Sequence, residues 1–211
     1  MDIGVTKRSS VTSSQVAEHA GVSQSAVSRT FTPGASISPK TRAKVLAAAK
    51  ELGYRPNAIA RSLITNRSRI IAVVLAYLEN LFYPDVLEEL GRRLAAENYH
   101  LLLFTGFMDR DSDPVFDQVM QYRVDGIILA STSLSSELSE ECTVAGIPVV
   151  LFNRTTERDT ASSVTTKNRE GGRLIGEFLI AGGHKSFGYI AGLESSSTNR
   201  DRLAGFRDGL A

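Results

Sequence analysis

The chain has 211 residues, of which 42% are hydrophobic and 22% are charged, so its composition is that of an ordinary globular protein. This composition excludes a disordered, collagen-like or disulfide-stapled chain. No apolar run approaches the roughly 18 residues that a membrane span needs, and the first ten residues lack the apolar core of a secretory signal. Cys142 is the only cysteine, which excludes an internal disulfide and leads us to expect a cytoplasmic protein, while the formal net charge of +1 by itself indicates no partner.

The charge is unevenly distributed along the chain. Residues 1–69 carry eleven Lys or Arg and three Asp or Glu, a net charge of +8, whereas the remaining 142 residues carry 13 basic and 20 acidic side chains, a net charge of −7. This asymmetry indicates two modules with different partners. The compact basic module is expected to attract the phosphate backbone of a nucleic acid.

The basic part begins with the signals of two short helices. Residues 12–15 (Thr-Ser-Ser-Gln) form a capping-box sequence, so a helix is predicted from there to Ala20. Gly21 is expected to end it, and a second helix, capped by Ser23, is predicted over residues 24–31. Two short helices joined by a tight turn that contains glycine are typical of the helix-turn-helix motif.

The second of these helices is predicted to have one apolar and one polar face. The polar face carries side chains that form hydrogen bonds: Gln24, Ser25, Ser28 and Arg29. Such a face suits recognition of base edges in the major groove. The alternative is a small helical domain whose polar face is merely solvated.

Two further helices are predicted before the charge changes sign. A third helix over residues 39–52 follows an N-cap serine and has apolar side chains at helical spacing. A short helix over residues 57–64, which Asn57 can cap, carries Arg61 and Leu63 on different sides. This last helix is too short to be stable alone in water, so it should need a partner in order to form.

The acidic part alternates predicted strands and helices. Apolar runs predict strands over residues 70–76, 101–104, 126–130, 148–152 and 187–191. Amphipathic stretches predict helices over residues 83–98, 115–120, 137–145 and 171–181, and a last one from about residue 201. Repeated βαβ units of this kind predict a doubly wound parallel sheet, in which ligands bind outside the carboxyl ends of the strands.

Two stretches carry a family resemblance. Residues 11–29 (Val-Thr … Val-Ala-Glu-His-Ala-Gly-Val-Ser … Val-Ser-Arg) and residues 38–63 (Ser-Pro-Lys-Thr-Arg … Leu-Gly-Tyr-Arg-Pro-Asn … Ala-Arg-Ser-Leu) resemble the lactose-repressor/galactose-repressor family of bacterial transcription regulators. The resemblance runs from Val11 to the end of the chain. It implies an N-terminal all-α helix-turn-helix module followed by an α/β periplasmic-binding-protein-like domain with a doubly wound parallel sheet.

The resemblance also implies domain boundaries. They are residues 1–56 for DNA binding, 57–69 for a hinge helix and linker, and 70–211 for effector binding, with a first lobe over about 70–158 and the start of a second lobe over about 159–211. Because family members continue well past this point, we expect the second lobe to be incomplete. Apolar side chains of its first helix, such as Ile175, Phe178 and Leu179, should then be poorly covered.

In the DNA-binding module the resemblance implies roles for individual residues. Gln24, Ser25 and Arg29 match base-contacting positions, and Thr12 and Ser13 match positions near the phosphates. Leu63 matches the hinge leucine that, paired across a dimer, wedges into the minor groove, and it could also pack against the sister hinge helix. Arg29 could instead contact a phosphate, which gives affinity without sequence discrimination. The loop over residues 32–36 departs from the family's usual Asn-Gly segment, and we expect its turn to be retained.

In the effector domain the resemblance points to four residues, and the position of a strand end points to a fifth. Asn153 matches a position, often Asp, that contacts effector hydroxyls, and Arg202 matches the arginine that binds the effector. Phe82 and Tyr83 belong to a segment similar to the family's Asn-Pro-Phe-Phe, with leucine in place of proline, and either ring could stack on a sugar. Ser131, at the carboxyl end of a predicted strand, is expected to join them. Alternatively, the two aromatic rings pack a helix against the sheet and Arg202 is an ordinary surface arginine.

Motifs for catalysis and metal binding are missing from the sequence. There is no G-x-x-x-x-G-K-[ST], G-x-G-x-x-G or G-x-S-x-G motif, and residues 195–197 (Ser-Ser-Ser) are interpreted as a loop. His19, His100 and His184 are scattered and offer no zinc-site spacing, while the acidic run over residues 109–113 is not followed by the Gly and Glu of a calcium loop. We therefore expect no enzyme activity, no metal site and no cofactor.

The sequence thus predicts a transcriptional regulator, most simply a repressor, that binds a pseudo-palindromic operator in double-stranded DNA as a homodimer. A small effector, a sugar or related metabolite, is expected to shift the two halves of the sensor domain and to disfavour the ordered hinge. The alternative is a small-ligand binding protein or a sugar-modifying enzyme on the same α/β scaffold. Residues 11–69 argue against this alternative, because neither protein would need them.

Overall fold

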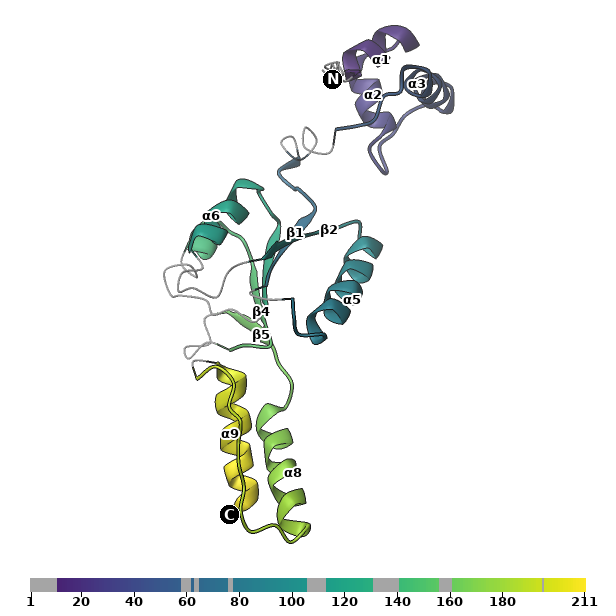
Figure 1. The fold of residues 1–211 in the computed structure, drawn as a ribbon. Helices are drawn as coiled ribbons and strands as arrows, with labels where there is room; N and C mark the ends of the chain where they lie inside the picture. Colours follow the sequence, from purple (N-terminus) through teal and green to yellow (C-terminus); the bar gives the residue numbers. More distant parts are fainter. Residues whose placement is uncertain are drawn as a thin grey trace, which may run out of the picture. The chain divides into compact units, whose positions relative to one another are not determined.

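The computed structural model describes residues 11–57, 62, 65–75, 78–105, 113–130, 141–155, 161–194 and 196–211. The chain divides into two compact units, Met1–Arg61, which is helical, and Ser62–Ala211, which is an α/β unit (Figure 1). Among the described helices, none is long and apolar enough to cross a membrane. Most of the predicted hinge helix and residues 137–140 of another predicted helix lie outside the described residues.

The helical unit contains three helices, each of which begins at a hydroxyl N-cap. They are α1 (Ser13–Ala20), α2 (Gln24–Thr30) and α3 (Pro39–Leu52), with the N-caps Thr12, Ser23 and Ser38. Gly21 and Gly53, in the left-handed conformation, end α1 and α3, as the sequence predicts. The three helices bury a small core whose most deeply buried hydrophobic side chains are small: Val16, Ala17, Val27, Val45, Ala48 and Ala49.

The α/β unit is built on a five-stranded parallel sheet of order β2-β1-β3-β4-β5. Its strands are β1 (Ile70–Leu75), β2 (His100–Thr105), β3 (Gly126–Ala130), β4 (Val149–Phe152) and β5 (Ser162–Val164). The parallel, doubly wound sheet confirms the predicted fold class. The short strand β5 was not predicted, because its three residues are exposed and not apolar as a set.

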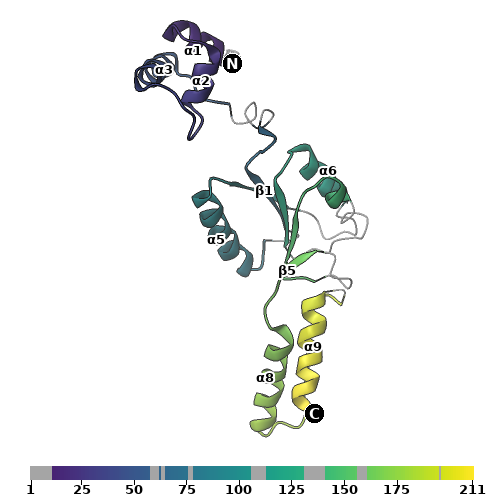
Figure 2. The same cartoon turned by 180° about the vertical axis from the view of Figure 1, so that it is seen from behind.

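Helices cover both faces of this sheet. Alternate residues of β1 face opposite sides: Val73 and Leu75 pack with Tyr83 of α5 (Phe82–Ala96), whereas Ala72 and Val74 pack with side chains of α6 (Asp113–Gln121). In Figure 1 and Figure 2, α5 and α6 lie on opposite sides of the sheet. The continuous apolar runs of the strands therefore reflect burial on both faces, as expected for a parallel sheet.

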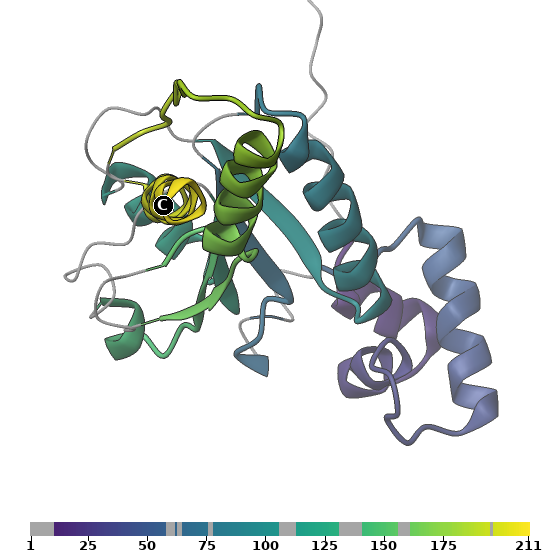
Figure 3. The same ribbon diagram turned by 90° about the horizontal axis from the view of Figure 1, so that it is seen from below.

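The chain then forms a pair of long helices, α8 (Asn168–Ala181) and α9 (Ser197–Leu210), that lie side by side in Figure 2 and Figure 3. Glycines from both helices line their contact. A methyl group at Gly172 would collide with the backbone of Arg202, and one at Gly205 would collide with the carbonyl group of Arg169. Because these glycines have no side chains, the two helix backbones can touch, and this contact fixes the position of α9 relative to α8.

The predicted strand over residues 187–191 is wrong, since these residues form no strand in the structure. Polar groups of this segment and of the residue after it turn to α9 instead: the Tyr189 hydroxyl donates to Asn199 Oδ1 at 3.4 Å, and the Gly192 N–H donates to the same oxygen at 3.0 Å. A strand needs a neighbouring ladder, and among the described strands none pairs with this segment. Ile190 is consequently fully exposed.

The assignment of residues 195–197 to a loop is also wrong in part. Ser196 is the N-cap of α9, its hydroxyl accepting from the Asn199 N–H at 3.4 Å, and Ser197 is the first helical residue. Helix α9 therefore begins four residues before the predicted position at residue 201. Serine's preference for the N-cap position is the signal that was available. As predicted, Ile175 and Phe178 are exposed on α8, and Leu179 is half-buried.

Candidate functional sites

The first candidate site is the outward face of α2 in the helical unit. Helix α2 buries Val27 and Thr30 in the core, which leaves the opposite face to solvent. That face carries exposed side chains at the four predicted positions: Gln24, Ser25, Ser28 and Arg29. A polar, cation-bearing face on a short helix can enter a major groove and form hydrogen bonds with base edges.

Hydrogen bonds orient several of these side chains. Gln24 Nε2 donates to the Ser13 hydroxyl of α1 at 2.9 Å, which links the two predicted DNA-contacting helices. Arg29 is anchored to Ser25, because its Nε donates to the Ser25 carbonyl and its Nη2 to the Ser25 hydroxyl, both at 3.3 Å. The Ser25 hydroxyl also shares a 2.9 Å hydrogen bond with the hydroxyl of Ser23. The structure therefore brings Ser13, Gln24, Ser25 and Arg29 into one polar surface.

Hydrogen bonds fix the start of α1, the end of α2 and the loop that follows α2. The Thr12 hydroxyl accepts from the Gln15 N–H at 3.3 Å, so it caps α1 beside Ser13. Arg42 Nη1 of α3 donates to the Thr30 carbonyl at 3.1 Å, which supports the last turn of α2. After α2 the Ala35 N–H donates to the Thr32 carbonyl at 3.2 Å, so the expected turn over residues 32–36 is retained. Asn57 is exposed, whereas Arg61 and Leu63 lie outside the described residues.

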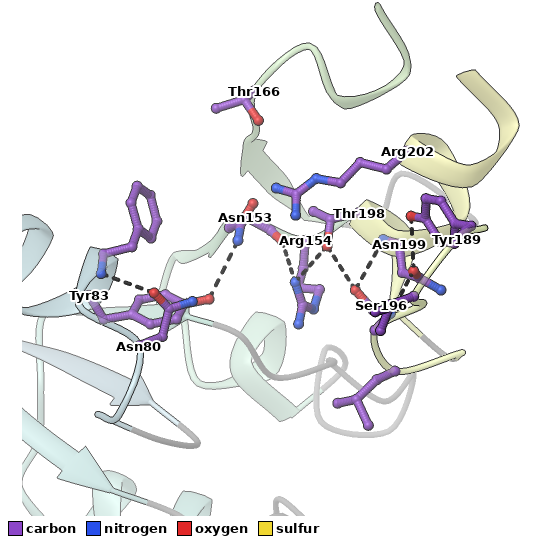
Figure 4. Close-up of a pocket in the computed structure, with 14 residues that line it drawn as sticks. Asn80, Tyr83, Asn153, Arg154, Thr166, Tyr189, Ser196, Thr198, Asn199 and Arg202 are labelled. Atoms are coloured by element: carbon purple, nitrogen blue, oxygen red, sulfur yellow. Dashed lines mark hydrogen bonds between the residues drawn. The ribbon is translucent and has the colours of Figure 1, made fainter. Parts of the chain in front are cut away.

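The second candidate site is a cavity of about 460 Å³ in the α/β unit (Figure 4). It lies where the carboxyl end of β4, the start of α5 and the N-terminal turn of α9 converge. Four of the five predicted effector residues line it, namely Phe82, Tyr83, Asn153 and Arg202. The fifth, Ser131, lies outside the described residues. The other described lining residues are Asn80, Arg154, Thr166, Tyr189, Ile190, Gly192, Leu193, Ser196, Thr198 and Asn199.

The two aromatic residues differ in burial. Tyr83 is only 1% exposed and packs against the sheet, while its hydroxyl accepts from Asn153 Nδ2 at 3.4 Å. Phe82 is 44% exposed and its ring stacks on that of Phe152 with 5.9 Å between the ring centroids. The Tyr83 ring thus packs α5 against the sheet, which was one of the two predicted roles, and its hydroxyl group reaches Asn153. The half-exposed Phe82 ring presents an apolar surface to the cavity.

Asn153 directly follows β4 and has the left-handed backbone conformation, with φ of 60°. Asparagine and aspartate tolerate this conformation better than other residues that have a Cβ atom. The Asn153 N–H donates to the Val164 carbonyl of β5 at 2.9 Å, so the backbone turns while its side chain reaches the cavity. The backbone geometry alone therefore favours Asn or Asp at this position.

Among the described residues that line the cavity, Arg154 and Arg202 carry the charged groups. Arg154 is 9% exposed, and its Nη1 donates to the Asn153 carbonyl at 2.8 Å and to the Thr198 hydroxyl at 3.1 Å. Arg202 Nε donates to Asn168 Oδ1 of α8 at 2.8 Å. The burial of Arg154 could not be predicted from the sequence, because it depends on the docking of α9. Tyr189 was missed because it was assigned to a strand.

The described part of the chain contains no group of three or more His, Cys, Asp or Glu residues that could hold a metal ion. The cavity has neutral hydrogen-bonding groups, a stacking ring and two guanidinium groups. Such a lining suits reversible binding of a small polar molecule with an apolar face.

Comparison with known proteins identifies both units. Residues 68–211 match the family model described as "Periplasmic binding proteins and sugar binding domain of LacI family", and residues 14–57 match the model of "Bacterial regulatory proteins, lacI family". The chain is 31% identical to catabolite control protein A of Staphylococcus xylosus, over 95% of this chain and 61% of that protein. It is also 31% identical to the HTH-type transcriptional repressor PurR of Vibrio parahaemolyticus, over 93% of this chain and 59% of the repressor.

A solved structure shows the same likeness. The chain is 28% identical to the lac repressor dimer bound to operator and the anti-inducer ONPF, with a TM-score of 0.80 over 95% of this chain and 62% of that one. The chain thus spans about 60% of the length of the relatives it matches. With a helix-turn-helix model matching the helical unit and a sugar-binding model matching the α/β unit, the chain belongs to the LacI family of bacterial regulatory proteins.

Proposed function

We propose that this protein is a sequence-specific, DNA-binding transcriptional repressor of the cytoplasm whose operator affinity is set by a sugar-like effector. It carries out no catalysis. Residues 1–56 bind DNA, residues 57–69 form the hinge and linker, and residues 70–211 bind the effector. The observation that carries the proposal is the ordered polar face of α2, in the part of the chain that holds the excess of positive charge.

On DNA, α2 occupies the major groove. Arg29, held at its Nε by the Ser25 carbonyl, presents its remaining N–H groups to a guanine, whose O6 and N7 accept two hydrogen bonds. Gln24 and Ser25 contact neighbouring bases, with Ser28 beside them on the same face. Thr12 and Ser13 at the start of α1 approach the phosphates, where helix N-termini favour negative charge.

The hinge and the dimer extend this contact. The lac repressor structure to which the chain is similar is a dimer bound to operator. In the same way two copies of this protein would place one recognition helix on each half of a pseudo-palindromic site. Asn57 caps the hinge helix, Arg61 contacts phosphate, and paired Leu63 side chains wedge into the central minor groove, where the unstacking cost is offset by contacts with the bent DNA.

The cavity binds the effector. The Phe82 ring stacks on the apolar face of a sugar, Asn153 and Ser131 bind hydroxyl groups, Arg202 fixes the ligand, and Tyr83 supports Asn153 through its hydroxyl. Because residues at the end of β4 and in α9 both line the cavity, a bound molecule favours one arrangement of these elements. The Arg154–Thr198 and Thr155–Ser197 hydrogen bonds join the same elements. Binding can therefore shift an equilibrium between two states of the sensor and the hinge.

Selection from a random DNA library followed by gel shift tests the proposal. The full chain is expected to enrich one sequence with two related halves. Arg29→Ala should lose about 1–3 kcal/mol for that site and relax its preference at one base pair per half. Lys50→Ala, which removes the same charge from the last turn of α3, should keep the base preference.

The hinge assignments have their own readouts. Arg61→Ala should mainly flatten the salt dependence of binding, because a lost phosphate contact releases fewer counterions. Leu63→Ala should reduce DNA bending and affinity together, and unchanged bending would show that the wedge assignment is wrong. If the wild-type chain enriches no sequence at physiological salt, the regulator proposal fails and a ligand-binding protein on the same scaffold becomes the better account.

A further inference from the structure

We propose that Asp125 is a positioning residue for DNA binding, whose carboxylate holds the end of the linker on the sheet and fixes where the linker leaves the α/β unit. The inference rests on the proposed function in one respect, namely that residues 57–69 connect a DNA-binding unit to a sensor. It goes further by assigning a role to a residue that belongs neither to the polar face of α2 nor to the lining of the cavity.

Both oxygens of the Asp125 carboxylate bind the linker. Oδ1 accepts from the Ser68 N–H at 2.8 Å and from the Ser68 hydroxyl at 3.0 Å, and Oδ2 accepts from the Arg69 N–H at 3.1 Å. The Asp125 N–H in turn donates to the Ile70 carbonyl at 2.8 Å. Hydrogen bonds to an ionised group are stronger than neutral ones, so this carboxylate clamp, made of Asp125 with residues 68–70, holds three consecutive residues at once.

The clamped backbone has a conformation that needs support from its surroundings. Arg69 has φ of 57°, a conformation in which the Cβ atom of a residue other than glycine is crowded by the backbone. The Arg69 carbonyl accepts from the His100 N–H at 2.8 Å, and the guanidinium carbon lies 5.9 Å from the centroid of the Tyr99 ring. Contacts from Asp125 and from the start of β2 thus impose one path on the end of the linker.

The carboxylate clamp and the cavity lie at opposite edges of the sheet. Asp125 directly precedes β3 and Ile70 begins β1, so the clamp lies at the amino ends of two neighbouring strands. The cavity lies at the carboxyl end of β4, which pairs with β3 in the same parallel direction. The clamp therefore joins the linker to the sheet whose other edge carries the cavity.

A fixed linker lowers the entropy cost of binding two half-sites at once. Residues 68 and 69 are already ordered by the clamp, whereas a released linker would have to be ordered when both recognition helices bind. A single half-site makes no such demand on the linker. The charge of Asp125 acts in the opposite direction, because a carboxylate repels the phosphates of DNA. Loss of the clamp should therefore weaken binding to two half-sites, although loss of the charge alone would strengthen it.

Hydrogen exchange of the full chain without DNA measures the clamp itself. In Asp125→Ala the amide hydrogens of Ser68 and Arg69 should exchange about tenfold faster or more, because both lose their acceptor. Asp125→Asn should retain part of the protection, since its amide oxygen can accept from Ser68 while its NH₂ group faces the Arg69 N–H. Asp117→Ala removes the same charge from an exposed position in α6 and should leave exchange at residues 68 and 69 unchanged.

Fluorescence anisotropy with two duplexes tests the role in DNA binding. One duplex carries both halves of the selected site and the other carries a single half. Asp125→Ala should bind the two-half duplex about tenfold more weakly than wild type and the single-half duplex equally well, with an unchanged base preference. Ser68→Ala, which keeps both backbone hydrogen bonds of the clamp, should show a smaller loss of the same kind, and it replaces Asp125→Ala if that variant does not fold.

The outcomes separate this inference from the regulator proposal. Unchanged exchange at residues 68 and 69, equal losses on both duplexes, or tighter binding of the two-half duplex by Asp125→Ala would overturn the inference. If the wild-type chain selects a DNA sequence but the clamp variants bind both duplexes as wild type does, the role of Asp125 is refuted and the regulator stands. A wild-type chain that selects no sequence would refute the regulator, and the role of the clamp in DNA binding with it.

Discussion

The helical unit and the α8–α9 pair are held together by different kinds of contact. In the helical unit each helix begins at a side-chain N-cap, and the fully buried side chains are small, such as Val16, Val27 and Val45. Helix α8 has no side-chain cap, and its contact with α9 depends on glycines that let the backbones touch. Its outer face exposes Phe178, which is 76% accessible.

The difference shows which structural signals are local. Caps and glycine stops act within a few residues, so the helical unit is specified by short stretches of sequence. The α8–α9 contact joins residues thirty or more positions apart, and only the folded pair shows why glycine is needed there. The helical unit should accordingly fail by loss of its core or its caps, and the α8–α9 pair by collision of the two backbones.

Gly205→Ala should have the largest effect. The added methyl group would collide with the carbonyl group of Arg169, and backbone atoms cannot rotate away, so we expect a loss of about 3 kcal/mol in the stability of the α/β unit. Gly91→Ala in α5 is the matched control. A methyl group there meets no atom within 4 Å and should raise stability by roughly 0.5–1 kcal/mol. Chemical denaturation followed by circular dichroism measures both, and a tolerated Gly205→Ala would refute the close-contact account.

Val45→Ala tests the other half of the comparison. Val45 is fully buried at the centre of the helical unit, and removal of two methyl groups from so small a core should cost about 2 kcal/mol. The loss should be confined to the helical unit. Hydrogen exchange resolved by segment measures this, and equal loss of protection in the sheet would contradict the independence of the two units.

Ser38→Ala should have a smaller effect. The Ser38 hydroxyl accepts from the Thr41 N–H at 3.1 Å, and loss of such a cap costs about 1 kcal/mol. Ser14→Ala, at an exposed position in α1, should change stability by less than about 0.5 kcal/mol. Thermal unfolding of the Ser38→Ala and Ser14→Ala variants measures the difference. Equal unfolding temperatures would show that the Ser38 cap does not stabilise the helical unit.

Surface ion pairs, such as those of Glu89 in α5, should contribute less than the core, the caps or the glycine contacts. The guanidinium groups of Arg92 and Arg93 lower the pKa of the Glu89 carboxyl group from 4.5 to about 2. A lowered carboxyl pKa adds stability above about pH 4.5, and this contribution is lost as the pH falls toward 2. Because the carboxyl group is exposed, the effect should be small and screened by salt. An NMR titration of Glu89 measures its pKa, and a midpoint near 4.5 would contradict the hydrogen bonds from Arg92 and Arg93 to this carboxyl group.

The sequence predicts the helical unit more completely than the α/β unit. The ends of α1 and α3 follow from Thr12, Gly21, Pro39 and Gly53, because capping depends on immediate neighbours. The strands β1 to β4 follow from apolar runs. The segment around Tyr189 was predicted wrongly, since its residues favour a strand but strand formation depends on a partner elsewhere.

The residues that line the cavity could be predicted only in part. Phe82, Tyr83, Asn153 and Arg202 could be named in advance because strand ends and the family resemblance mark their positions. The hydrogen bond from Arg202 to Asn168 and the burial of Arg154 could not, because both arise only when α9 docks against α8 and the end of β4.

The central claim is that α2 binds one DNA sequence in preference to others. Fluorescence anisotropy of the full chain, titrated onto its selected site and onto a scrambled duplex of equal length at physiological salt, measures this preference. We expect the chain to bind the selected site about 1,000-fold or more tightly than the scrambled duplex, and the Arg29→Ala variant to lose a large part of that ratio. Equal affinity for the two duplexes, or an unchanged ratio in Arg29→Ala, would contradict it.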